Sequence, residues 1–107
     1  MTLNDTERRR TSRELKADLA LSGLTPQEAA ADLGFTAQRL LFTLDVSPGA
    51  DPVDVWQLHD YLVRAAQDAG RSPAPATVLT EPARLLARRW FRLREAPRHD
   101  FGSRTLR

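Results

Sequence analysis

The chain contains no cysteine, which excludes disulfide bonds and thiolate metal sites. It has no apolar run near the roughly 20 residues that a membrane-spanning helix needs. Its first residues, Met1 to Asp5, lack the features of a signal peptide. We therefore expect a cytoplasmic protein with no membrane partner. With 107 residues, the chain has the usual length of one domain with one core.

The residue spacings typical of catalytic sites are also absent from the sequence. The two histidines, His59 and His99, lie far apart in the sequence, and neither has a serine, threonine or carboxylate pair at a catalytic spacing. A metal site needs more ligands than these, and no glycine-rich loop is suited to a phosphate. We predict that the protein is not an enzyme and binds no metal or cofactor.

Lysine is nearly absent, since Lys16 is the only one among sixteen basic residues, and the charges are unevenly distributed. Residues 1–16 carry five basic and three acidic residues. Residues 17–70 carry two basic and eight acidic residues, whereas residues 71–107 carry nine basic and three acidic residues. The small net charge of +2 therefore hides an acidic centre between two basic ends.

Capping signals predict helices and no strands. Asn4, Thr25, Thr36, Asp51 and Thr80 can each cap a helix start, and a glycine or a loop follows each of the first four helices. The expected helices span about residues 5–22, 26–33, 37–44, 52–69 and 81–93. The sequence thus predicts an all-α fold, a small bundle of about five helices. Residues 1–93 form the helical domain, and residues 94–107 form a basic, flexible C-terminal tail.

The second and third predicted helices have the spacing of a helix-turn-helix. Ala30 is small enough to let the next helix cross closely. Gly34 can take the left-handed conformation that the turn needs, and Leu40 can pack back from the next helix. We therefore predict a helix-turn-helix centred on Gly34.

Ser22 to Leu44 resembles the helix-turn-helix of phage-repressor-type bacterial regulators. The matching residues are Gly23-Leu24-Thr25-Pro26-Gln27-Glu28, Ala30, Leu33-Gly34 and Thr36-Ala37-Gln38. About residues 3–93 also resemble a family of small, uncharacterised bacterial proteins. That resemblance lies in Leu21-Ser22-Gly23-Leu24-Thr25, Ala30-Ala31-Asp32-Leu33-Gly34, Asp60-Tyr61-Leu62, Gly70, Pro73, Pro75 and Trp90-Phe91. It implies no known activity.

The repressor resemblance implies a DNA-binding regulator, a homodimer that presents its third helix, about residues 37–44, to the major groove of double-stranded DNA. The positions it assigns to base reading are Thr36, Gln38, Arg39 and Thr43. Gln38 could pair with adenine and Arg39 with guanine. The candidates for contact with the DNA backbone are Arg8, Arg9, Arg10, Arg84, Arg88 and Arg92.

Several features depart from that pattern. Thr43 stands where repressors place an aliphatic core residue, and the region around the third helix is acidic, although DNA binding depends on cations. Leu41 and Phe42 are either ordinary core or a surface for a partner. The stripe of Arg84, Arg88 and Arg92 could follow a phosphate backbone, cover the acidic centre of its own chain or of a dimer mate, or be solvated. The alternative function is a protein-interaction module that keeps helix-turn-helix geometry without binding DNA.

Overall fold

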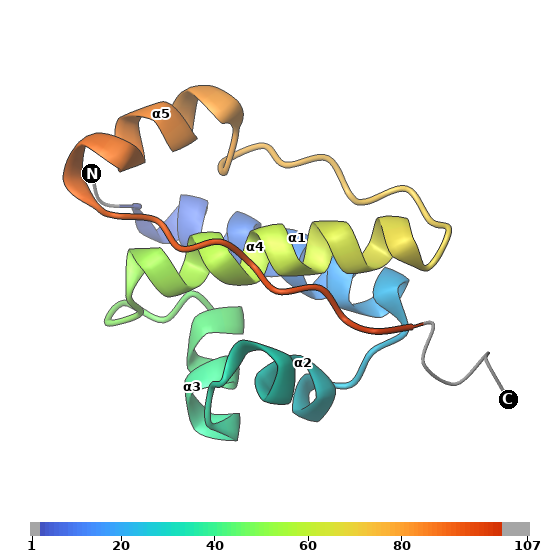
Figure 1. The fold of residues 1–107 in the computed structure, drawn as a ribbon. Helices are drawn as coiled ribbons and strands as arrows, with labels where there is room; N and C mark the ends of the chain where they lie inside the picture. The colour runs from blue at the N-terminus through green and yellow to red at the C-terminus, as the bar shows by residue number, and fades with distance from the viewer. Residues whose placement is uncertain (1–2, 102–107) are drawn as a thin grey trace, which may run out of the picture.

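A computed structural model describes residues 3–101, and in this range the chain forms five α-helices and no strand. They are α1 (Asp5–Ser22), α2 (Pro26–Leu33), α3 (Ala37–Leu44), α4 (Pro52–Asp68) and α5 (Glu81–Trp90). The two long helices α1 and α4 pack together and form the middle of the molecule, with α2 and α3 on one side and α5 on the other (Figure 1). The predicted all-α class is confirmed. No described helix could cross a membrane.

Side-chain caps explain where the helices begin. Asn4 accepts a hydrogen bond from the amide of Glu7 at 2.8 Å, and the Glu7 carboxylate accepts one from the Asn4 amide at 3.0 Å. Thr25 and Glu28 form the same reciprocal pair at the start of α2. These capping boxes satisfy amides that have no partner within the helix. The predicted last helix was too long, because the chain leaves the helix at Phe91 with φ −135° and ψ 146°.

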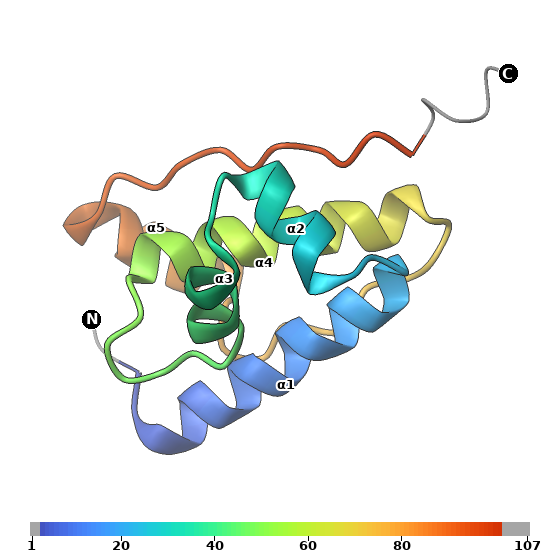
Figure 2. The same ribbon diagram turned by 90° about the horizontal axis from the view of Figure 1, so that it is seen from below.

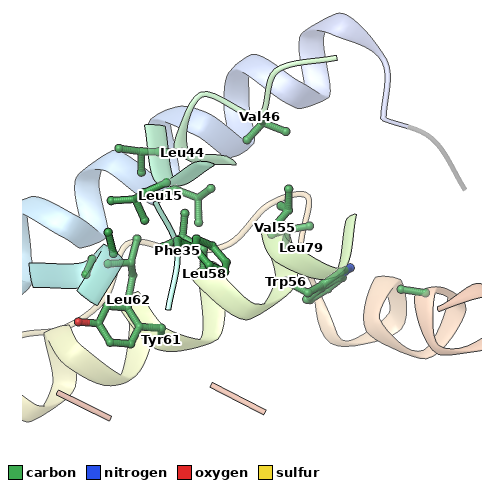
Figure 3. Packing of buried hydrophobic residues seen from close by; sticks show 14 residues of the cluster. Leu15, Phe35, Leu44, Val46, Val55, Trp56, Leu58, Tyr61, Leu62 and Leu79 are labelled. Atoms are coloured by element: carbon green, nitrogen blue, oxygen red, sulfur yellow. The ribbon is translucent and has the colours of Figure 1, made fainter. Parts of the chain in front are cut away.

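The core lies between α1, α3 and α4 and is filled mainly by α4. Leu58 and Leu62 are fully buried and meet Leu15 of α1, while Phe35 and Leu44 close the core from the α2–α3 side (Figure 3). Each fully buried leucine or phenylalanine contributes about 1.5–3 kcal/mol relative to its exposed state. This packing holds α3 against α4 and leaves one side of α3 facing solvent.

The connection from α4 to α5 is extended and bound to α1. The buried carboxylate of Asp18 accepts a hydrogen bond from the Ala74 amide at 2.7 Å, and Glu14 accepts from the amide and hydroxyl of Thr77. Burial raises the pKa of Asp18, and the bond from Ala74 partly offsets this effect. These contacts set where α5 starts.

Residues 91–101 run extended along α4 (Figures 1 and 2). Gln57 donates to the carbonyl of Glu95 at 2.9 Å, Arg94 pairs with Asp54, and Arg98 pairs with Asp68 at 2.8 Å. Residues 94–101, which were assigned to the tail, therefore contact the helical domain. The rest of the predicted tail, 102–107, lies outside the described residues.

Candidate functional site

The segment predicted as a helix-turn-helix consists of α2, a short turn and α3. Gly34 ends α2 in the left-handed conformation, with φ 72° and ψ 26°, and the Phe35 amide bonds to the Ala30 carbonyl at 2.9 Å. The Thr36 hydroxyl then accepts from the Arg39 amide at 3.0 Å and starts α3. The turn has the conformation expected from glycine and the caps, and it fixes which face of α3 is exposed.

We expect Gly34→Ala to cost about 1 kcal/mol, because an L-residue is strained at this positive φ. A Cβ at this position would meet no atom within 4 Å, so the cost is conformational and not steric. Gly34→Asn is the matched control and should cost less, since asparagine tolerates this conformation. Urea denaturation measures both, and equal losses would contradict this explanation.

Arg39, the predicted reader of guanine, is paired with a residue of its own chain, although its side chain is 42% exposed. Its guanidinium donates two hydrogen bonds to Asp54, at 2.8 and 2.7 Å, and lies 4.0 Å from the centre of the Phe35 ring. The bonds from Arg39 lower the pKa of Asp54 despite its burial, and Arg94, which pairs with the same carboxylate, adds to the effect. Arg39 would have to leave Asp54 to reach a base.

The other three base-reading candidates have different surroundings. Gln38 is exposed at the start of α3, and Thr36 is exposed but uses its hydroxyl as the helix cap. Thr43 is only 1% exposed, and its hydroxyl donates to the Arg39 carbonyl at 2.7 Å. The assignment of Thr43 to base reading was wrong, because its side chain faces the core. Threonine fills the place of an aliphatic residue here by bonding to its own helix.

Leu41 and Phe42 are exposed, at 50% and 47%. Of the two interpretations that the sequence left open, the core assignment was therefore wrong. Gln38, Leu41 and Phe42 are spaced i, i+3 and i+4 and share the solvent side of α3. We call these three residues the α3 face.

Arg84, a candidate for contact with the DNA backbone, is also paired with a residue of its own chain. It donates to both oxygens of Asp60, at 2.9 and 2.5 Å, and lies 4.7 Å from the centre of the buried Trp56 ring. Burial alone would raise the pKa of Asp60, but hydrogen bonds with His59 and Arg84 outweigh it and lower the pKa to about 2. Of the three interpretations of the arginine stripe, Arg84 therefore fits the one in which the stripe covers the acidic centre of its own chain.

The Asp60 carboxylate should make the unfolding free energy depend on pH in the acidic range. Because its pKa falls from 3.8 to about 2 on folding, it stabilises the fold fully above about pH 4, and this contribution, about 2 kcal/mol, is lost as the pH falls towards 2. We expect Asp60→Asn to show a smaller loss of unfolding free energy than the wild type over this pH range. Identical pH dependence in chemical denaturation would contradict it.

The remaining backbone-contact candidates are divided between two regions. Arg8, Arg9 and Arg10 lie on α1, where Arg8 pairs with Asp5, whereas Arg88 and Arg92 are exposed on and after α5. Because α5 and α3 lie on opposite sides of the α1–α4 pair (Figure 1), the structure does not bring Arg88 and Arg92 to the α3 face.

The acidic centre is largely paired by residues that are distant in sequence. Lys16 pairs with Asp45 at 2.8 Å. Asp32 accepts from the Tyr61 hydroxyl at 2.5 Å and contacts His99 Nδ1 at 2.7 Å. Sequence reasoning missed these pairs, because no local spacing connects such residues. No group of metal-binding side chains occurs in the part of the chain that the structure describes.

Comparison with known proteins identifies a family. A family model described as "Uncharacterized protein conserved in bacteria (DUF2316)" matches residues 1–92. The chain belongs to this family. The resemblance to small uncharacterised bacterial proteins is thereby confirmed, and the DUF2316 match covers all five helices described above. Searches among curated proteins and solved structures gave no match. The DUF2316 description assigns no activity.

Proposed function

We propose that the protein is a protein-interaction module that binds a partner chain through the α3 face. The observation that supports it is the exposure of Leu41 and Phe42 on one side of a well-anchored helix. Neighbouring large apolar side chains on a surface usually mark a site of contact. The rest of α3 is fixed by Leu40, Thr43 and Leu44, which are buried, so the face is presented on a rigid element.

The charges around α3 favour a protein partner over DNA. The α3 face has no charged side chain, and Arg39 and Arg94 are both bound to Asp54. A DNA-binding surface usually gains most of its affinity from cations that contact phosphates. An uncharged face suits an apolar protein surface instead. A second copy of this chain would also fit, because a symmetric contact would bring no like charges together.

DNA binding is the second candidate, and Gln38 favours it. This side chain is exposed at the start of α3, where glutamine could pair with adenine. Arg9, Arg13 and Lys16 are spaced along one side of α1, and Lys16 reaches Asp45 at the end of α3. A cation therefore lies beside the C-terminal end of α3, where it is paired with Asp45. In this case the protein would act as a helix-turn-helix regulator of transcription.

A photoreactive amino acid at position 42 tests the proposal in the bacterium that makes this protein. We expect a covalent protein adduct whose yield falls strongly when Leu41→Ser is added, because the partner packs on both side chains. The same photoreactive residue at the exposed Ala17 of α1 is the control and should not give that adduct. A DNA adduct at position 42 would favour the second candidate and contradict the first.

Purified components then separate a loss of binding from a loss of folding. Leu41→Ser should change the unfolding free energy by less than about 1 kcal/mol, because the side chain is already half exposed. Its affinity for the captured partner, or for a second copy, should fall at least tenfold. Leu85→Ser is the matched control and should bind normally, because Leu85 belongs to α5, which lies across the α1–α4 pair from α3 (Figure 1).

A further inference from the structure

The helix α5 is turned the opposite way from an ordinary surface helix. Its small residues face the protein, with Ala87 fully buried and Ala83 packed against the core. Its large apolar residues face solvent, with Leu85 62%, Leu86 50% and Trp90 69% exposed. Leu86 and Trp90 are spaced i and i+4 and form an apolar edge of the helix, and the structure leaves that edge uncovered.

Arginines surround these apolar side chains. The side chains of Arg88, Arg89 and Arg92 are exposed and make no hydrogen bond or ion pair within residues 3–101. With Trp90 they line an open groove between α5 and the segment that follows it. Arg84 and Arg94, at the same groove, are already paired with Asp60 and Asp54. We call the exposed residues the α5 surface: Leu85, Leu86, Arg88, Arg89, Trp90 and Arg92.

We propose that the α5 surface binds the surface of an anionic lipid bilayer. Leucine and tryptophan side chains on one side of a helix enter the boundary between headgroups and acyl chains, and nearby arginines attract anionic lipids. The helix lies at the outer edge of the molecule and away from α2 and α3 (Figure 1). It can therefore lie flat on a membrane while the α3 face stays open. This inference is independent of the proposed function.

The charge pattern disfavours a second copy as the occupant. Pairing two α5 surfaces would bring six unpaired arginines together. The acidic residue of α5, Glu81, already lies 3.4 Å from Arg84. Nucleic acid would satisfy the arginines and could stack on Trp90, but it would leave Leu85 and Leu86 in water. An anionic bilayer accounts for both the cations and the apolar side chains.

Intrinsic tryptophan fluorescence of the full chain tests this directly. Trp90 is exposed and Trp56 is 2% exposed, so a change in polarity on binding reports on Trp90. We expect vesicles of phosphatidylcholine with phosphatidylglycerol to shift the tryptophan emission to shorter wavelength. The protein should also sediment together with these vesicles. Vesicles of phosphatidylcholine alone should do neither, and 0.5 M salt should release the protein. Equal binding to both kinds of vesicle, or to neither, would overturn the proposal.

Two double variants with the same charge change locate the site. Arg88→Ala with Arg89→Ala should weaken vesicle binding about 25-fold, since each arginine near an anionic membrane contributes about a factor of five. Arg64→Ala with Arg71→Ala removes two exposed arginines at and beyond the far end of α4 and should weaken it less than about threefold. Equal effects of the two double variants would overturn the assignment of the site.

A further double variant tests the apolar side chains, and two further outcomes test the other possible binding partners of the α5 surface. Leu85→Ser with Leu86→Ser should keep the helical circular dichroism of the wild type and lose vesicle binding at least tenfold. Unchanged binding would overturn the proposal. Self-association that buries Trp90 in the absence of lipid would also overturn the proposal. The same holds if the protein binds oligonucleotides through Arg88 and Arg89 but does not bind anionic vesicles.

Discussion

Trp56→Ala is expected to destabilise the protein by about 4 kcal/mol, the range found when a buried tryptophan is truncated to alanine. The ring is 2% exposed, belongs to the core cluster and carries the Arg84 guanidinium at 4.7 Å from its centre. Its loss would open a cavity at the N-terminal part of α4 and remove the surface on which α5 rests. The total unfolding free energy of a domain is about 5–15 kcal/mol, so this loss is a large fraction of it.

Trp90→Ala is the matched control, because it removes the same side chain from a site that is 69% exposed. We expect a change within about 0.5 kcal/mol. Urea denaturation followed by circular dichroism measures both variants without depending on tryptophan emission. Similar losses for the two variants would show that α5 does not pack over the Trp56 ring with Trp90 facing solvent.

Asp54→Ala should destabilise the protein by about 3 kcal/mol. The carboxylate is almost fully buried and accepts hydrogen bonds from Arg39 and Arg94, so its removal deletes three charge-assisted bonds near the start of α4. Both arginines are nearly half exposed and can reach water, which keeps the loss below that of a fully buried pair.

The control is Asp68→Ala, which breaks a more exposed pair with Arg98 and should cost less than about 1 kcal/mol. A double-mutant cycle between Arg39 and Asp54 should give a favourable coupling free energy of at least 1 kcal/mol. A coupling free energy of zero would mean that the Arg39 side chain does not pair with Asp54 in solution. Arg39 would then remain a candidate for base reading.

The helices were largely predictable because their signals are local. Caps such as Thr25 and Thr36, and the glycine at position 34, act within a few residues of the helix ends that they set. Val46 shows the limit of such signals. It takes a positive φ of 48°, which favours glycine, and it is also 4% exposed in the core. Burial of its side chain fixes a conformation that its local sequence does not favour.

The exposed surfaces could not be predicted, since they depend on contacts between distant residues. Arg39 has the right place for a base reader, and only the fold brings Asp54 beside it. The rotation of α5 follows from the pairing of Arg84 with Asp60 and the close packing of Ala87. The spacing of Leu86 and Trp90 gives α5 an apolar side, but spacing alone does not determine the direction in which that side points.

If the α3 face contacts protein and not DNA, as we propose, the protein should prefer no duplex sequence. Selection from a random duplex library at low ionic strength tests it most directly, because any DNA reader should enrich a sequence. We expect no enriched sequence, and residual duplex binding that Gln38→Ala leaves unchanged. An enriched motif whose affinity falls at least tenfold with Gln38→Ala would show instead that α3 is a recognition helix.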